Sequence, residues 1–301
     1  MVPKESPLAK EIIEDQGFSS DGQIIIAMFP IHRENEAKEK GMGQIAPFSC
    51  RNYYKETINR MKLIVKQVAP QLTKKQYRLF SNSRLPEKSL ALEAGLGFRG
   101  KNSLLINRSI GSRGVLAGMI LPGEIKVLEY SPEENDEALS NCGNCRLCEK
   151  ACPGGAISDE GFCKEKCLQF WTTESGIVPD DIKRNWGSIL YGCTICQDIC
   201  PWNRKIPESR AIDLGALPQG IPLTFLLTAA QEEIKSYFRN SNMGMSWITP
   251  RMLQRNAVLC AANEGLSELI PLIEKRLSEA KDPSLEDACR WALKVLKRDQ
   301  D

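Results

Sequence analysis

The stretch CGNCRLCEKACP at residues 142–153, read together with CTICQDICP at residues 193–201, decides the fold. Its spacing, C-x2-C-x2-C-x3-C-P, is typical of bacterial ferredoxin-type sites, where three thiolates of a tight loop hold one 4Fe–4S cluster and the fourth cysteine holds the other. The proline after the fourth cysteine opens a new helical turn. The second stretch has three cysteines and also ends in Cys-Pro. The two runs therefore predict two clusters that exchange ligands.

This exchange assigns seven ligands. The expected ligands of the first cluster are Cys142, Cys145, Cys148 and Cys200. Those of the second are Cys152, Cys193 and Cys196. The second set lacks a fourth thiolate, and local spacing does not choose between Cys163 and Cys167. C-x2-C pairs also hold zinc, but eight thiolates and two Cys-Pro pairs favour iron–sulfur clusters.

Cysteine usage along the whole chain supports metal binding. Nine of the twelve cysteines lie between residues 142 and 200 of a 301-residue chain, whereas a disulfide framework is typical of short secreted chains. The other three, Cys50, Cys260 and Cys289, are predicted to be small buried apolar residues. The N-terminus lacks an apolar signal core and no run approaches a membrane span. We therefore expect a cytoplasmic protein.

The elements predicted from periodicity give an α+β protein in three parts. Residues 1–130 are expected to form an α/β domain, with strands at 23–31, 78–83, 103–107 and 114–121 and helices at 53–69 and 89–97. In the longer helix, one apolar stripe is predicted. Its members are Ile58, Met61, Leu63, Ile64 and Val68.

The remaining two parts follow an acidic linker at 131–141. Residues 131–204 are expected to form a ferredoxin-like domain for two 4Fe–4S clusters, with little regular structure. Residues 205–301 are expected to be helical and HEAT-like. Their paired apolar stripes lie at 251–265, 266–280 and 284–298.

Charge is unevenly distributed, although the net charge is only +2. Residues 51–108 contain thirteen Lys and Arg against three Asp and Glu. Such a stretch is either a solvated helical face or a footprint for phosphates, including those of a nucleic acid.

Several motifs resemble the epoxyqueuosine reductase family, cobalamin-dependent iron–sulfur enzymes of tRNA modification. The most specific is GSILYGCTICQDICPWN at 187–203, after CGNCRLCEKACPGGAI and CLQFWTTESGIVP. The segment AGLGFRGKNSLLINRSIGS at 94–112 is similar to the family's AGLG-x-x-GKN-x-LLI pattern. GMSWITPRMLQRNAVLCAANEG at 244–265 resembles its helical region.

The resemblance implies a chemistry and further site residues. It implies cobalamin in the α/β domain, reduced through two 4Fe–4S clusters, and removal of an epoxide oxygen from a queuosine precursor in tRNA. It also implies an external low-potential electron donor and selects Cys167 over Cys163 as the eighth ligand. The residues that it places near the corrinoid are Lys101, Asn102, Leu105, Phe170 and Gly192.

The chain also departs from the family pattern. It is N-terminally shortened, and FSNSRLPEK at 80–88 stands where the family has an acidic residue proposed as proton donor. Ser81 or Asn82 occupies that place, and neither delivers a proton as a carboxylic acid does. The Asp-Tyr-His triplet is altered to NYY at 52–54, and the lone His32 is not expected to ligate cobalt. The catalytic residues are therefore left unassigned.

Two alternatives to epoxyqueuosine reduction remain open at the level of sequence. One is a related cobalamin and iron–sulfur reductase that acts on a different substrate, because the proton donor is missing. The other is a two-cluster electron carrier without catalysis. The AGLG and GKN segment, which such a carrier would not need, argues against the second.

Overall fold

The computed structural model of the protein describes residues 1–31, 39–125, 142–204 and 217–298. The chain forms two compact units, each assembled from discontinuous segments. The first unit comprises Met1–His32, Tyr53–Arg146 and Cys200–Asp213. The second comprises Arg33–Asn52, Leu147–Ile199 and Leu214–Asp301. The division into 1–130, 131–204 and 205–301 stays a prediction, and the 131–141 linker and His32 lie outside the described residues.

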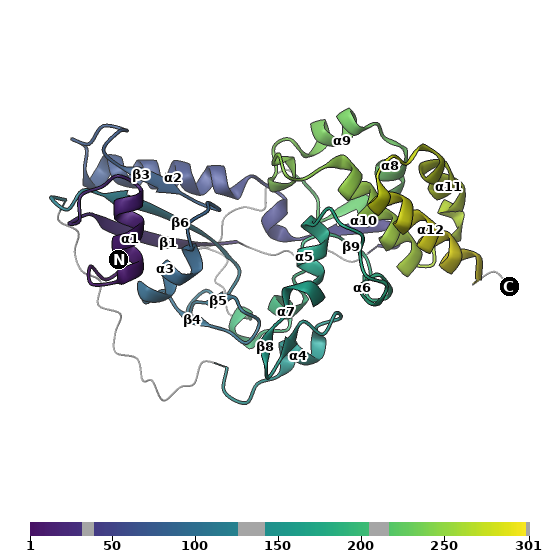
Figure 1. The fold of residues 1–301 in the computed structure, drawn as a ribbon, viewed down its shortest axis with the longest axis horizontal. Helices are drawn as coiled ribbons and strands as arrows, with labels where there is room; N and C mark the ends of the chain where they lie inside the picture. The colour runs from purple at the N-terminus through teal and green to yellow at the C-terminus, as the bar shows by residue number, and fades with distance from the viewer. Residues whose placement is uncertain (32–38, 126–141, 205–216, 299–301) are drawn as a thin grey trace. The chain divides into compact units, whose positions relative to one another are not determined.

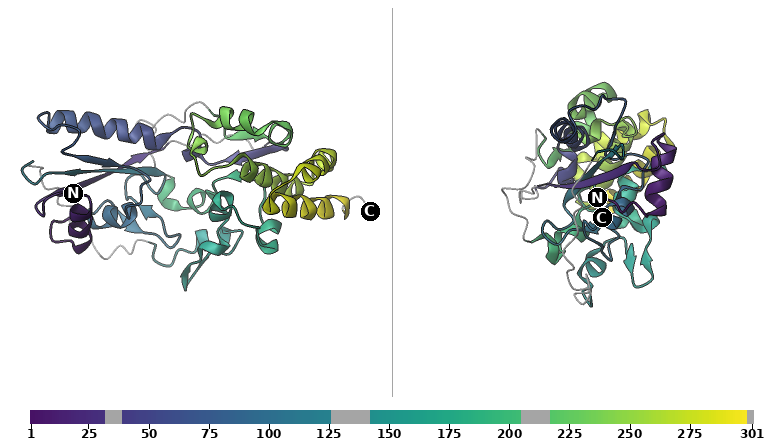
Figure 2. Two further views of the ribbon diagram at one scale, coloured as in Figure 1. Left: turned by 45° about the horizontal axis from the view of Figure 1, so that its top comes forward. Right: turned by 90° about the vertical axis from the view of Figure 1, so that its left-hand side faces the viewer.

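The first unit is built on an antiparallel sheet in the order β1 (Gln23–Pro30), β6 (Gly114–Leu121) and β3 (Arg78–Phe80). Helix α2 (Tyr53–Val68) covers one face, and α1 (Pro7–Asp15) and α3 (Glu87–Glu93) cover the other (Figure 1; Figure 2, left). A short hairpin, β4 (Phe98–Arg99) and β5 (Leu105–Ile106), follows α3. The predicted strands and helices are confirmed, although β3 and β5 are shorter than expected.

Alternation along β1 explains why both faces of this sheet are covered. Ile24 and Ile26 pack in one apolar cluster with α1 and α3, whereas Ile25 and Ala27 pack in another with α2. Successive side chains of a strand point to opposite faces. A strand that is apolar at nearly every position therefore needs a helix on each side.

The apolar stripe predicted for α2 is partly wrong. The helix buries residues spaced four apart, namely Tyr53, Thr57, Met61 and Val65. Leu63, Ile64 and Val68 are instead 60%, 37% and 55% exposed. At 3.6 residues per turn, Leu63 lies on the side of the helix opposite to Met61. Ile64 and Val68 share the face of Met61 and Val65 but remain exposed, so helical spacing alone did not identify the buried residues.

The second unit combines a small sheet with helices. Strand β2 (Met42–Ile45) pairs antiparallel with β10 (Gly220–Pro222) and parallel with β9 (Ile189–Tyr191). The helices are α8 (Leu223–Thr228), α9 (Gln231–Phe238), α10 (Pro250–Asn263), α11 (Ile270–Glu279) and α12 (Pro283–Arg298). The helical C-terminal part is confirmed apart from β10, and its HEAT-like character stays a prediction. Strand β2 was not expected from the sequence.

The cysteine-rich segment contains only short elements, as expected. They are α4 (Leu147–Ala151), β7 (Ile157–Ser158), β8 (Gly161–Phe162), α5 (Leu168–Thr173), α6 (Asp180–Arg184) and α7 (Ile195–Asp198). Cys50, Cys260 and Cys289 are at most 1% exposed, which confirms that they are buried. The mixed α and β composition agrees with the predicted α+β class. Among the described helices, none is both long enough and apolar enough to cross a bilayer.

A buried pair on α10 holds the short elements of the second unit. The Arg255 guanidinium, 1% exposed, donates to the carbonyl oxygens of Trp171 (2.5 Å), Glu174 (2.6 Å) and Gly176 (3.0 Å). Burial lowers the pKa of Arg255 to about 10, so the group stays charged at neutral pH. Its neighbour Asn256 donates to the carbonyl oxygens of Thr172 (3.0 Å) and Leu190 (2.9 Å). Helix α10 thereby fixes α5 and β9.

We expect Arg255→Met to lower the free energy of unfolding by about 3 kcal/mol, because it removes the buried guanidinium that bonds three partly buried carbonyl oxygens. Arg290→Met is the matched control, since Arg290 is exposed and forms a surface ion pair with Glu286, and should cost less than about 1 kcal/mol. Urea unfolding of both variants measures the difference. Equal midpoints would contradict the role given to Arg255.

Candidate functional site

Four thiols of the second unit lie close together. Cys152 follows α4, Cys167 precedes α5, and Cys193 and Cys196 flank the start of α7. Burial, and then the charges of Cys193, Cys167, Cys152 and Cys148, raise the pKa of Cys196 to about 12. Such electrostatic coupling requires the sulfur atoms to be near one another. The sequence-predicted second set is thus brought together in one unit.

Cys163, the rival candidate for the eighth ligand, makes a different contact. Its sulfur lies 3.5 Å from Oε2 of Glu165. Burial raises the pKa of Cys193 to about 12, and the thiols that add to this rise are Cys167 and Cys152. Cys163 is not among them. The assignment of Cys167 as the eighth ligand, which the family resemblance implies, stays a prediction.

Backbone N–H groups point at several of these sulfurs. Ala156 donates to Sγ of Cys152 at 3.3 Å. Burial raises the pKa of Cys167, and backbone hydrogen bonds from Phe170 and Gln169 oppose that rise. Such bonds stabilise a thiolate, the form that binds metal, and tune the reduction potential of an iron–sulfur cluster. The donor set therefore fits a cluster.

The four predicted ligands of the first cluster come from segments of both units. Cys142, Cys145 and Cys200 belong to the first unit, and Cys148, on α4, belongs to the second. Burial raises the pKa of the Cys200 thiol, and Cys142 and Cys145 add to this rise. Three of the four predicted ligands thus lie close together within the first unit.

Lys101 holds the loop that carries Cys142 and Cys145. Its Nζ donates to the carbonyl oxygens of Gly143 (2.9 Å) and Cys145 (3.1 Å). An ammonium group has three donors and no acceptor, so it is suited to gathering carbonyl oxygens. The GKN turn predicted to approach cobalamin therefore anchors a cysteine loop.

The Cys200 segment is fixed to the same unit by Asn203. Its Oδ1 accepts from the Ser112 N–H at 2.7 Å, and its Nδ2 donates to the Ser112 hydroxyl at 3.0 Å. Gly111 has φ +65°, and a Cβ there would stand 2.1 Å from Oδ1 of Asn203. Only glycine allows this approach. Trp202 adds an edge contact with Phe98, at 5.4 Å between ring centroids.

A chain of hydrogen bonds connects this region to the 80–88 loop. Ser81 donates to the Leu116 carbonyl oxygen and accepts from Thr57 of α2. Lys88, six residues after Asn82, donates to the carbonyl oxygen of Ser103 in the GKN turn at 3.4 Å. Helix α3, which follows the loop where the family's acid was expected, is therefore bonded to the turn that holds the first cysteine loop.

A carboxyl group missed in the sequence is present in this loop. Glu87 accepts hydrogen bonds from the N–H groups of Asn82 (3.1 Å) and Ser83 (2.7 Å). Burial, and then the charge of Glu87, raise the pKa of the Tyr54 phenol. The Glu87 carboxylate therefore lies close enough for its charge to act on the Tyr54 phenol. Glu87 could have been singled out from the sequence, since it is one of only three acidic residues in 51–108. It was not expected as the acid because it lies several residues after Ser81 and Asn82, the positions that match the family's acidic residue.

The five residues that the resemblance assigns to cobalamin have structural roles. Lys101 bonds the cysteine loop, Asn102 is 4% exposed and accepts from Leu104 N–H, and Leu105 is 5% exposed in the apolar core. Gly192, at φ +79°, would bring a Cβ within 2.6 Å of the Ala46 side chain. Phe170 is half-buried against Trp171. The corrinoid contacts assigned to these five residues stay a prediction.

The thiols do not form a site for a single metal ion. Within the described ranges, no three Cys, His, Asp or Glu side chains gather as ligands of one ion. Zinc draws its four ligands to one centre, whereas the thiolates of a 4Fe–4S cluster each hold a separate corner. The argument for clusters over the zinc alternative rests on the cysteine spacing and the two Cys-Pro pairs.

Residues 141–203 match the family described as 4Fe-4S double cluster binding domain. The chain is 30% identical over 212 residues to an epoxyqueuosine reductase of Staphylococcus aureus, covering 69% of this chain and 53% of the relative. It is 29% identical to that of Vibrio cholerae, covering 81% and 64%. The chain thus spans between about half and two thirds of the length of these relatives.

The fold agrees with these likenesses. The solved structure of epoxyqueuosine reductase from Bacillus subtilis matches with a TM-score of 0.73 and 25% identity, over 91% of this chain and 72% of that one. A further epoxyqueuosine reductase structure, with a tRNA stem loop, matches in fold with a TM-score of 0.65 and 24% identity, over 91% and 81%. The resemblance indicated by the motifs is confirmed, and the chain carries a double-cluster domain.

Replacing Cys167 with serine should remove the second cluster and leave about four iron atoms per chain in place of about eight. Replacing Cys163 with serine should leave the iron content and the spectra unchanged, because the family resemblance assigns the eighth ligand to Cys167. Iron and sulfide analysis of anaerobically purified protein, with EPR after reduction, measures both. The reverse result would assign Cys163 as the ligand.

Lys101→Met should make the first cluster labile, because the Gly143 and Cys145 carbonyl oxygens lose their shared donor. We expect iron to be lost to a chelator several-fold faster, with the EPR signal of one cluster falling first. Lys66→Met, at an exposed position of α2, removes the same charge and should match the unsubstituted protein. Equal loss rates in the two variants would reject the anchoring role.

Proposed function

We propose that the protein is an iron–sulfur reductase of the epoxyqueuosine reductase type, acting on a modified nucleoside of tRNA in the cytoplasm. The observation that carries the proposal is the double-cluster domain joined to a unit whose GKN turn anchors the first cysteine loop. An external low-potential donor would supply electrons. Removal of an epoxide oxygen consumes two electrons and two protons and yields an alkene and water.

The proposed cluster ligands follow the two thiol groups described above. The first cluster takes Cys142, Cys145, Cys148 and Cys200. The second takes Cys152, Cys167, Cys193 and Cys196. The support is the ferredoxin spacing, the crowding of thiols in each group and the N–H groups directed at sulfur.

Cobalamin is proposed as the cofactor on the family resemblance. The contacts assigned to it on the GKN segment stay a prediction, so we derive no step through it. Titration of the purified protein with cobalamin, followed by visible spectra, tests this part independently of turnover.

The proposed RNA partner is supported by the charge of the first unit. Helix α2 presents Lys55, Lys62 and Lys66 at exposed positions, and a related fold was solved with a tRNA stem loop. Exposed lysines that neutralise phosphates give binding that weakens as salt rises.

A proton source is proposed at the junction of α2 and the 80–88 loop. Like any phenol, Tyr54 is protonated at neutral pH, and burial and then the charge of Glu87 raise its pKa further. It is therefore a group in this loop region that can hold a proton, in place of the missing acid. Glu87, bonded to the Asn82 and Ser83 N–H groups, would fix the loop beside it.

An anaerobic reaction with epoxyqueuosine tRNA, reductant and added cobalamin tests the activity. Formation of queuosine supports the proposal, whereas cobalamin uptake without any product would favour a different substrate. Clusters without cobalamin uptake would favour a plain electron carrier.

We expect Tyr54→Phe to slow a single turnover on the order of a hundredfold, the usual contribution of a positioned acid. Iron content and cobalamin uptake should stay unchanged. Tyr237→Phe, an exposed tyrosine of the second unit, serves as the matched control. A Tyr54→Phe variant with full activity would place the proton source elsewhere.

A further inference from the structure

A cation lies beside the cysteine loop of the first unit. The Nζ of Lys101 is 2.9 Å from the carbonyl oxygen of Gly143 and 3.1 Å from that of Cys145. Lys101 is half-buried, so water screens its charge less than that of an exposed lysine. A positive charge stabilises the reduced, more negative state of a nearby iron–sulfur cluster. Lys101 therefore raises the reduction potential of a cluster held by this loop.

A second cation, Arg113, lies beside the Cys200 segment. Arg113 directly follows Ser112, which forms hydrogen bonds of 2.7 Å and 3.0 Å with the Asn203 side chain. These bonds hold residues 111–113 against the turn that begins at Cys200. Burial raises the pKa of the Cys200 thiol, and the positive charge of Arg113 opposes that rise. Arg113 thus acts on the same cysteine group as Lys101, and with the same sign.

The cysteine group of the second unit has a carboxylate beside it. Asp198 is the last residue of α7, the helix that carries Cys196, and its Oδ2 accepts a hydrogen bond of 3.0 Å from the Thr194 hydroxyl. This bond holds the carboxylate over the turn that follows Cys193. Burial raises the pKa of Cys193 to about 12, and the charge of Asp198 adds to this rise. A negative charge at this place lowers the reduction potential of a nearby cluster.

Backbone N–H groups do not set the two cysteine groups apart. The Ala156 N–H donates to Sγ of Cys152 in the second group at 3.3 Å. In the first group, a hydrogen bond from the Trp202 backbone lowers the pKa of Cys200 against the larger effect of burial. Hydrogen bonds to sulfur raise the potential of either cluster. The side-chain charges, in contrast, differ in sign between the groups.

We propose that these charges order the reduction potentials of the two clusters, so that electrons pass from the second cluster to the first. Lys101 and Arg113 raise the potential of the first cluster, and Asp198 lowers that of the second. The transfer moves one electron and breaks no bond. The second cluster is oxidised as the first is reduced, and the external donor proposed above then reduces the second again.

This order gives the electrons a direction toward the region proposed for chemistry. The cluster of higher potential is the one whose cysteine loop is bonded by Lys101 of the GKN turn. The donor protein would accordingly deliver its electron to the second unit. The inference rests on the cluster ligands given under the proposed function, and it does not depend on the identity of the substrate.

The test is an anaerobic redox titration of the holoprotein, followed by EPR. Two one-electron steps are expected, and Cys167→Ser should retain only the step at the higher potential. Arg113→Met should lower that step and shift electron exchange about tenfold toward the second cluster, which is about 59 mV for a one-electron couple. Arg113→Lys, which keeps the charge, should leave the step near its original potential. Asp198→Asn should raise the lower step by a similar amount.

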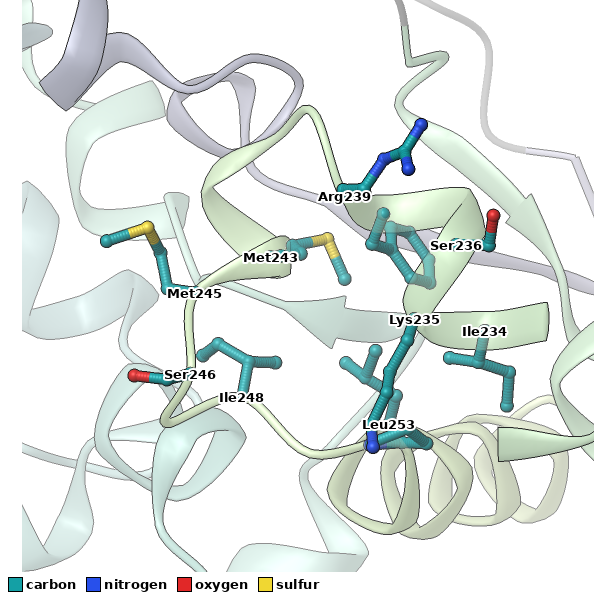
Figure 3. Close-up of a pocket in the computed structure, with 12 residues that line it drawn as sticks. Ile234, Lys235, Ser236, Arg239, Met243, Met245, Ser246, Ile248 and Leu253 are labelled. Atoms are coloured by element: carbon teal, nitrogen blue, oxygen red, sulfur yellow. The ribbon is translucent and has the colours of Figure 1, made fainter. Parts of the chain in front are cut away.

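Two exposed charges of the second unit serve as matched controls. Arg239→Met removes an arginine at the edge of a pocket of about 330 Å³ (Figure 3), and the twelve described residues that line this pocket include no cysteine. Asp181→Asn removes an exposed carboxylate of α6. Because water and salt screen exposed charges, both variants should leave the two potentials unchanged.

Shifts of equal size in the control variants would reject the local role of Arg113 and Asp198. Two steps at one potential, or retention of the lower step in Cys167→Ser, would overturn the order. Turnover is measured separately. The expected order without product from epoxyqueuosine tRNA rejects the proposed substrate alone, whereas turnover with equal or reversed potentials rejects the electron path alone. Fewer than about eight iron atoms per chain would reject the ligand sets on which both depend.

Discussion

A loop that carries metal ligands has too few apolar residues to bury a core of its own, and its position depends on polar side chains from neighbouring elements. In this protein those side chains bond the carbonyl oxygens of the loops. Lys101 does so for Gly143 and Cys145, and Arg255 for the segment after Cys167. A cation with several N–H donors thus bonds carbonyl oxygens that regular secondary structure would otherwise pair. Without it, several carbonyl oxygens of these loops would lose their protein partners.

The two units use this device differently. In the first, the cysteine loop is tied to a turn that is also bonded to the 80–88 loop, through Lys88 and Ser103. In the second, Arg255 and Asn256 lie inside the apolar core around α10. The first arrangement connects the cysteines to the region proposed for chemistry, and the second gives the short elements around Cys167 and Cys193 a rigid support.

Much of the fold could be predicted from the sequence. Strands β1 and β6 and helices α2, α10 and α12 were expected within a residue or two, because strong periodicity and terminal Pro or Gly mark them. Strand β2 was missed, since MGQI has neither the length nor the alternation of a strand and is formed by pairing with distant β9 and β10. The exposed Leu63 and Val68 show that apolar residues on a helix identify a buried face only when the neighbouring layer is known.

The candidate site, like the fold, could be predicted from the sequence only in part. Cysteine spacing by itself determined seven ligands and their exchange between clusters, because thiolate geometry on a tight loop is a local property. The choice of Cys167 over Cys163 came from the family resemblance and stays a prediction. The hydrogen bonds of Lys101 to the cysteine loop and the proximity of Tyr54 to Glu87 became visible only in the tertiary structure. Each depends on groups brought together from segments far apart in the chain, and sequence spacing carries no information about such distances.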